Sequence, residues 1–158
     1  MDQLLSNKEL IQRIRRFQIR AKDITNGKWR YGAYLPTYGV YGVIVPKDDS
    51  FADQKHIIFS EVPTPGMEDF GFPTTIKSYY VDPATICACT GLRDKKRLFV
   101  YENDILTFDK NETEYIVKFD YSDGEGRFRL YCQNMPNFVG VVNNIMMQCM
   151  TVKGNIFD

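Results

Sequence analysis

The chain has 158 residues, of which 44% are hydrophobic and 25% charged, and its formal net charge is zero. This length fits one domain, or one domain with a small appendage, and the composition is ordinary for a globular protein. No apolar run approaches the roughly 20 residues of a membrane span, and the first residues lack the basic flank and apolar stretch of a signal peptide. We therefore expect a cytoplasmic protein that makes no contact with a membrane.

Residues 7–15 are predicted to form a short N-terminal helix. Ser6 and Glu9 have the spacing of a capping box, in which each side chain accepts a hydrogen bond from the other residue's backbone N–H. Apolar residues then recur at helical spacing, at Leu10, Ile11, Ile14 and Phe17. A helix below about 12 residues is marginal in water on its own. We expect its apolar stripe to pack on its own domain or on a second subunit, and we favour a homodimer.

The start of the chain is basic. Up to Tyr31 it carries eight basic and three acidic residues, a net charge of +5. Such a segment can contact phosphates, and interleaved aromatic residues can stack on bases. The candidate nucleic-acid contacts are Arg13, Arg15, Arg16, Arg20 and Trp29. Alternatively this segment faces the acidic remainder of the chain or a partner subunit. The overall pI of about 6.6 favours this reading, and a protein partner over nucleic acid.

The next part of the chain is predicted to be a set of strands. Asn26-Gly27 indicates a hairpin with a type I′ turn between strands at 17–23 and 28–35. Further strands are expected at 38–46 and 56–62. The segment 63–75 has three prolines, two glycines and no periodicity, which is typical of a loop.

The second half reads as an antiparallel meander. Three strand-like segments, linked by short polar turns, are expected at 97–108, 114–121 and 127–132. An apolar stretch from Phe138 to Phe157 then ends in a further strand. Aromatic residues make up 14% of the chain, which also favours strands. The predicted class is mainly β, antiparallel and compact.

The sequence contains little that indicates catalysis or metal binding. A zinc set can be imagined from Cys87, Cys89, Cys132, Cys149 and His56. However, a Cys-x-Cys pair inside an apolar strand is more typical of two reduced core residues. No residue is indicated as a nucleophile near the single histidine, and no phosphate-binding glycine motif occurs. We predict a protein that is not an enzyme and that carries no metal and no cofactor.

Turn residues are concentrated between 90 and 104. Thr90-Gly91-Leu92 begins a turn that Asp94 can cap, and Glu102-Asn103-Asp104 forms a corner before an apolar strand. Asn is the residue other than Gly that best accepts a left-handed backbone, so we expect Asn103 to adopt one. The alternative is that Glu102 and Asp104 form the acidic pair of a metal-dependent enzyme. We favour the structural reading.

Two blocks of the sequence resemble the YopX family of phage and prophage proteins. They are "FQIRAKDITNGKWRYG" at 17–32 and "VDPATICACTGLRDKKRLFVYENDILTF" at 81–108, and the terminal "VKGNIFD" is also similar. Arg97 and Asn103 stand where the family has glycine. The resemblance implies a single domain over residues 1–158 with a small β-barrel of the Src-homology-3-like type. Its expected parts are a helical extension (1–16), an N-terminal hairpin and strands (17–62), a loop (63–75) and the barrel meander (76–158).

The resemblance carries over no catalytic residue. It implies only a set of motif positions, which we interpret as structural: Thr90, Gly91, Leu92, Asp94, Glu102 and Asp104. A non-catalytic binding or assembly protein of phage or prophage origin is therefore expected. The alternatives are a nucleic-acid-associated phage protein and, less favoured, the metal-dependent enzyme.

Overall fold

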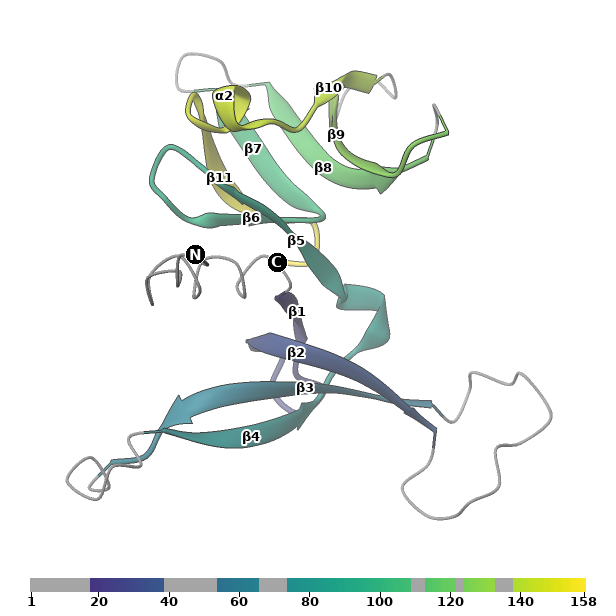
Figure 1. Ribbon diagram of the computed structural model, residues 1–158, viewed down its shortest axis with the longest axis vertical. Coiled ribbons are helices and arrows are strands. Elements are labelled where there is room, and N and C mark those ends of the chain that lie inside the picture. The colour runs from purple at the N-terminus through teal and green to yellow at the C-terminus, as the bar shows by residue number, and fades with distance from the viewer. Residues whose placement is uncertain (1–17, 39–53, 66–73, 109–112, 122–123, 133–137) are drawn as a thin grey trace, which may run out of the picture. The chain divides into compact units, whose positions relative to one another are not determined.

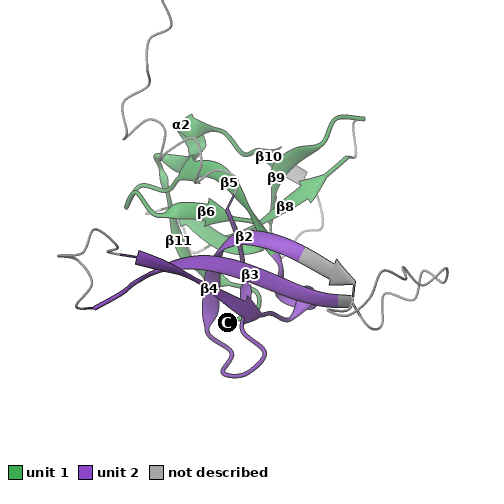
Figure 2. Cartoon of the chain, turned by 60° about the horizontal axis from the view of Figure 1, so that its bottom comes forward, with its two compact units in different colours: residues 1–17, 87–158 green, residues 18–86 purple. Residues whose placement is uncertain are grey.

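The computed structural model describes residues 18–38, 54–65, 74–108, 113–121, 124–132 and 138–158 (Figure 1). The described residues form antiparallel sheets with almost no helix, so the predicted mainly β class is confirmed. The helix expected at 7–15 and nearly all of the strand expected at 38–46 lie outside these residues. The chain divides into two compact units, whose described parts lie within 18–86 and 87–158 (Figure 2).

The unit at 18–86 contains four strands in the order β4-β3-β2-β1, each antiparallel to its neighbour. They are β1 (Ile19–Lys22), β2 (Trp29–Tyr38), β3 (Gln54–Pro63) and β4 (Thr74–Tyr80), followed by the 3-10 turn η3 (Pro83–Thr85). Ala21, Ile58 and Val81 form the buried centre of this unit. Partly buried side chains pack around them: Ile19, Tyr34, Tyr79 and Ile86.

The β1–β2 hairpin confirms the two predicted strands but not the predicted turn. Lys22 pairs with Trp29, and the backbone N–H of Asp23 donates to the carbonyl of Lys28 at 2.9 Å. A type I′ turn needs a positive φ at both central residues, and here only Gly27 has one, at 66°. The type I′ prediction is therefore wrong. The loop is wider because the Asp23 carbonyl accepts from the Gly27 N–H at 2.8 Å.

The unit at 87–158 combines a hairpin with a five-stranded antiparallel sheet. The hairpin pairs β5 (Cys87–Arg93) with β6 (Phe99–Tyr101), and the sheet has the order β10-β9-β8-β7-β11. Its strands are β7 (Asp104–Phe108), β8 (Glu114–Asp120), β9 (Arg127–Cys132), β10 (Phe138–Val141) and β11 (Met150–Asn155). The buried core contains six side chains with no exposed surface: Val100, Leu106, Val117, Leu130, Met147 and Met150.

The predicted Src-homology-3-like barrel is not found as a closed barrel among the described residues. Closure requires the first and last strands of a sheet to pair with each other. In the described part of this unit the five-stranded sheet ends at β10 on one side and at β11 on the other. Both outer strands also carry a register shift, at Phe138/Gly140 and at Val152/Gly154. Such bulges bend a strand and weaken its further pairing.

A helix that the sequence analysis did not predict lies between β10 and β11. It is α2 (Asn144–Met147), and the Asn143 side chain caps it by accepting from the Met146 N–H at 3.0 Å. The two asparagines before an apolar triplet were a possible signal, but four residues are too few to show helical periodicity. In the described part of the chain, no helix has the length and apolar character needed to cross a membrane.

Candidate binding surface

The acidic corner at 102–104 is built into the backbone of its unit. Asp104 is fully buried, and its carboxylate accepts from the Tyr101 N–H at 2.8 Å and from the Asn155 side-chain amide at 3.1 Å. The same amide donates to the Glu102 carbonyl at 3.2 Å. Asn103 has φ 64°, so the expected left-handed corner is confirmed. These contacts join the β6–β7 corner to β11.

The turn predicted to begin at Thr90-Gly91-Leu92 is not found there, because these residues lie inside β5 (Cys87–Arg93), where the pairing with β6 shifts in register, and the hairpin turn follows at 94–98. Their contacts are nevertheless similar to those of the corner. The Thr90 hydroxyl donates to the Val100 carbonyl at 2.9 Å and accepts from the Leu92 N–H at 3.1 Å. Gly91 has φ 76°, a conformation that suits glycine. The Asp94 carboxylate accepts from the Leu98 N–H at 2.8 Å and from the Val152 N–H at 3.1 Å. It therefore connects the β5–β6 hairpin to β11.

An acidic metal pair does not fit this geometry. Asp104 has no exposed surface, whereas Glu102 is half-buried, so the Asp104 carboxylate cannot present itself to an external ligand. Among the residues that the structure describes, no three His, Cys, Asp or Glu side chains are grouped to hold a metal ion. The four cysteines are free thiols, three of them buried and Cys149 exposed.

The tip of the β5–β6 hairpin gives a first stability prediction. Arg97 has φ 66°, a left-handed conformation that costs an ordinary residue about 1 kcal/mol. We expect Arg97→Gly to raise the free energy of unfolding by about 1 kcal/mol, measured by urea denaturation. The neighbouring Lys96 has no positive φ, so Lys96→Gly is expected to lower stability. Equal effects of the two variants would contradict this account.

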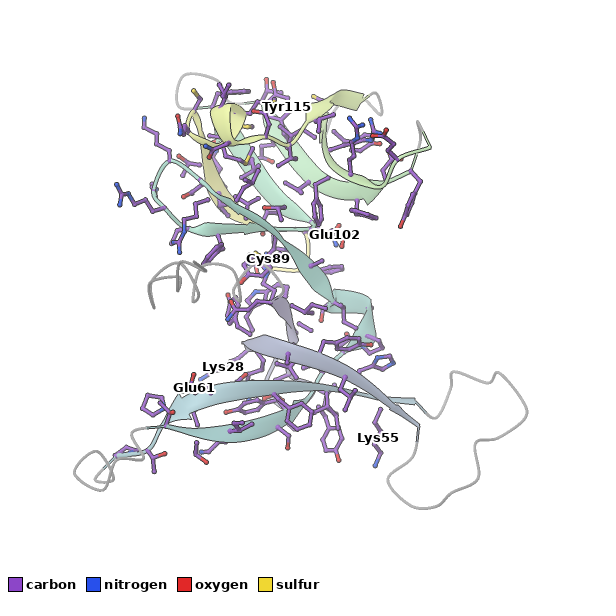
Figure 3. All side chains as sticks on the ribbon, in the orientation of Figure 1. Lys28, Lys55, Glu61, Cys89, Glu102 and Tyr115 are labelled. Carbon is purple, nitrogen blue, oxygen red and sulfur yellow. The ribbon has the colours of Figure 1, made fainter. Side chains whose placement is uncertain are left out.

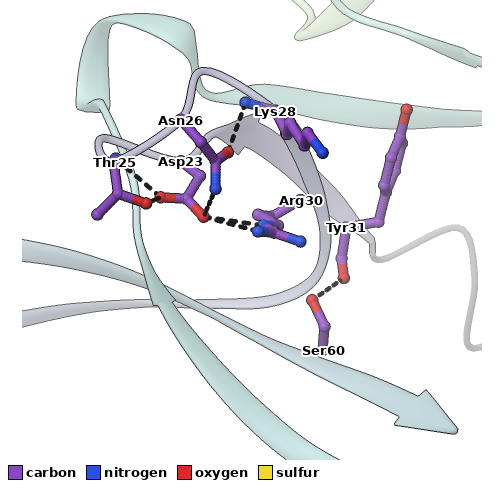
Figure 4. A network of polar contacts seen from close by, with 7 residues as sticks. All are labelled: Asp23, Thr25, Asn26, Lys28, Arg30, Tyr31 and Ser60. Atoms are coloured by element: carbon purple, nitrogen blue, oxygen red, sulfur yellow. Dashed lines mark hydrogen bonds and ion pairs between the residues drawn. The ribbon is translucent and has the colours of Figure 1, made fainter.

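The β1–β2 loop is organised by the carboxylate of Asp23 (Figure 4). One oxygen accepts from the Thr25 N–H at 2.9 Å and from the Thr25 hydroxyl at 2.6 Å. The other accepts from Arg30 Nε at 3.0 Å and Nη2 at 2.9 Å. The hydrogen bonds from Thr25, followed by the Arg30 guanidinium, lower the pKa of Asp23 to about 2. The Arg30 guanidinium also stacks over the Tyr79 ring, 3.9 Å from its centroid.

The depressed pKa of Asp23 predicts a pH dependence of stability. Because the folded pKa lies below the model value of 3.8, the ionised carboxylate stabilises the fold above about pH 4, and this contribution is lost as the pH falls towards 2. We expect the stability difference between wild type and Asp23→Asn to shrink by about 2 kcal/mol between pH 6 and pH 2. Urea denaturation at both pH values measures it, and a difference that is constant with pH would refute the assignment.

One face of the 18–86 sheet carries large exposed apolar side chains. Residues directly opposite in an antiparallel sheet share a face, and Leu35 is opposite Ile57, which in turn is opposite Tyr80. Extending this register places five exposed side chains on the same face, which we call the apolar face: Tyr31, Leu35, Phe59, Ile76 and Tyr80. Their exposed fractions range from 36% for Phe59 to 73% for Ile76. The solvent side of an antiparallel sheet is normally polar, so this face has the character of a contact surface.

Basic side chains lie on the same face. Arg20 and Lys22 are placed over the Trp29 ring, at 4.5 and 5.4 Å from its centroid, and Lys55 lies 5.4 Å from the Tyr80 ring. Lys55 and Glu61 lie towards opposite ends of β3 (Figure 3). Arg20 and Trp29, two of the predicted nucleic-acid contacts, are thus adjacent, but Arg20 is buried whereas Trp29 is partly exposed. The other three, Arg13, Arg15 and Arg16, lie outside the described residues.

Trp29 was predicted from the sequence as a contact residue, but the apolar face was not predicted. The alternation Tyr31-Ala33-Leu35 and the pair Ile76 and Tyr80 were visible signals. Alternation shows that residues share a face of their own strand. It does not show which faces of three strands coincide, or that this side is exposed, because those properties depend on the pairing register.

Comparison with known protein families identifies a match over most of the chain. The sequence profile of the YopX protein family matches residues 44–158, which is most of the chain. The block at 81–108 and the terminal "VKGNIFD" lie inside the matched range, whereas the block at 17–32 precedes it. No curated protein sequence matches the chain.

Proposed function

Because the chain belongs to the YopX protein family, we propose that it is a phage- or prophage-derived protein that acts in the bacterial cytoplasm as a non-catalytic binding or assembly module. We further propose that residues 1–158 act together as one functional domain, despite the division into two compact units. The partner in this proposal is a protein, bound through the apolar face.

The observation that carries the proposal is the gathering of five large apolar side chains on one sheet face. Burying an exposed aliphatic or aromatic side chain stabilises a complex by roughly 1.5–3 kcal/mol. Tyrosines supply a large contact area with little loss of side-chain freedom, and they are common among the residues that dominate interface energies. The basic residues Lys22 and Lys55 on the same face favour a partner with an acidic rim.

A matched pair of double variants tests this role. The double variant Tyr31→Ser/Leu35→Ser removes two large side chains of the apolar face, which are 43% and 49% exposed. Tyr121→Ser/Leu98→Ser removes the same residue types from the 87–158 unit, where they are 69% and 55% exposed. Each immobilised full-length protein is mixed with lysate of phage-carrying host cells, and the recovered proteins are identified by mass spectrometry.

The proposal predicts one specific protein that wild type and the Tyr121/Leu98 variant retain and that the Tyr31/Leu35 variant loses. Circular dichroism checks that all three proteins are folded. Equal recovery by the two variants, or no specific recovery by wild type under several conditions, would exclude a protein-binding role for this face.

A second candidate function is binding of single-stranded nucleic acid. The observation that favours it is the stacking of Arg20 and Lys22 on Trp29, since aromatic and basic side chains on one sheet face can stack bases and neutralise phosphates. Trp29 is the single tryptophan, so its fluorescence reports directly on this surface. In an oligothymidine titration, log affinity should fall steeply with log salt concentration, and Lys22→Ala, at a partly exposed position, should weaken binding. A flat salt dependence, or affinity unchanged by combined Arg13, Arg15 and Arg16 to Ala substitution, would exclude this function.

A further inference from the structure

We propose that two copies of this chain associate by antiparallel pairing of their β4 strands, with the two-fold axis at Ile76. β4 is the outer strand of its unit's β4-β3-β2-β1 arrangement (Figure 1). Its pairing with β3 is regular over all seven residues. The outer strands β10 and β11 of the other unit each contain a register shift. Bulges, prolines and charges are devices that protect sheet edges, and β4 has only Lys77.

The hydrogen-bonding pattern shows which part of the β4 edge is open to a second strand. The Val81 N–H donates to the His56 carbonyl at 2.9 Å, so the odd-numbered residues direct their backbone groups towards β3. The backbone N–H and C=O groups of Thr74, Ile76 and Ser78 therefore point away from β3. Among the described residues, no hydrogen bond to these backbone groups is found. At Tyr80 the outer edge is already used, because its carbonyl accepts from the Ile24 N–H at 3.1 Å. The open edge is therefore 74–78.

These constraints favour one register among the two-fold arrangements centred on residues 75 to 78. An axis at Thr75 would pair only residues 74–76 of each copy, which is a shorter ladder than an axis at Ile76 gives. A two-fold axis at Lys77 would place like charges directly opposite each other, which is unfavourable. An axis at Ser78 would require the outer edge of Tyr80, where Ile24 is bonded. An axis at Ile76 uses only 74–78, with Thr74 opposite the partner's Ser78.

The Ile76 register is also favourable for the side chains. It sets Ile76, which is 73% exposed in the single chain, against the partner's Ile76. Thr75 then lies opposite the partner's Lys77, and no charge faces a like charge. Opposite residues share a face in an antiparallel pair, so the apolar faces of the two copies join into one surface. The pairing uses neither the N-terminal segment nor any other partner, so it can fail or hold independently of the proposed function.

Cysteine cross-linking of the full-length protein tests the register. In a Cys149→Ser background, which removes the exposed native thiol, single variants Ile76→Cys, Lys77→Cys and Ser78→Cys are oxidised mildly. Directly opposite residues in a hydrogen-bonded pair have Cα atoms about 5.5 Å apart, within the range of a disulfide. Ile76→Cys should give a covalent dimer. In the proposed register the two copies of Ser78 are offset by four residues, roughly 13 Å, and should not cross-link.

Light scattering of the native chain supplies the second measurement. A dimer mass is expected at tens of micromolar. Ser78→Pro removes an outward N–H without disturbing the pairing with β3, and it should raise the dimer Kd at least about tenfold while the unfolding midpoint changes little. A monomeric mass for the native chain would overturn the proposal. So would preferential cross-linking through Lys77→Cys or Ser78→Cys, or an unchanged Kd for Ser78→Pro, which would indicate another dimer surface.

Discussion

Replacing Asp104 with alanine is expected to lower the free energy of unfolding by about 4 kcal/mol. The side chain is fully buried, and its loss leaves the Tyr101 N–H and one Asn155 amide hydrogen without their acceptors. Each buried donor without a partner costs roughly 1–3 kcal/mol, and the lost carboxylate leaves a cavity as well. Urea denaturation, followed by circular dichroism, measures the change.

Two further variants define the cause of this effect. Asp104→Asn keeps the shape of the side chain and one acceptor oxygen, but it turns an NH2 group towards a donor. The free energy of unfolding is therefore expected to fall by about 2 kcal/mol. Glu102→Ala removes a half-buried side chain and should change stability by less than about 1 kcal/mol. If Asp104→Ala were as stable as wild type, the corner would not depend on this carboxylate.

Gly32→Ala is expected to lower the free energy of unfolding by about 4 kcal/mol. A Cβ atom at this position would lie 2.0 Å from the Phe59 carbonyl oxygen, which is backbone and cannot move away by a side-chain rotation. The residue also has φ 157°, which L side chains rarely adopt. The β2 and β3 backbones would have to separate, and the core around Ile58 would open.

Gly27→Ala is the matched control for this substitution. Gly27 has φ 66°, but a Cβ added there meets no atom within 4 Å. It should therefore cost only the backbone strain, about 1 kcal/mol. The difference between the two variants, measured by urea denaturation, gives the cost of the close approach between β2 and β3. Similar losses for both would show that this approach is looser than the structure indicates.

Several features follow from the sequence alone because they depend on the chemistry of neighbouring residues. Asn103 was expected to take a left-handed conformation because asparagine accepts one at low cost, and its φ is 64°. The strand at 56–62 was expected from its apolar, β-branched composition, and it lies within β3 (Gln54–Pro63). Asp94 was expected to cap a turn, and its carboxylate accepts a hydrogen bond from the Leu98 N–H across the β5–β6 turn. Class, strands and turn residues are local properties of this kind.

The turn at Asn26-Gly27 shows where local reasoning ends. The dipeptide alone predicts a tight hairpin, but the Asp23 carboxylate also bonds Thr25 and Arg30, and this network stabilises a wider loop. The competing contact to Arg30 comes from the opposite strand, seven residues away along the chain. Its strength cannot be assessed before the two strands are paired.

The apolar face and the role of Asp104 were decided only by the tertiary structure. The Asp104–Asn155 hydrogen bond joins residues 51 positions apart, and the Asp94–Val152 bond joins residues 58 apart. Leu35, Phe59 and Ile76 come from three strands, and a shift of one residue in any pairing would turn one of them to the other face. Such contacts depend on the register of the paired strands and on the closure of long loops. Both are determined by many residues together. Sequence patterning determined which residues alternate along each strand, and the pairing of the strands determined which of those faces coincide.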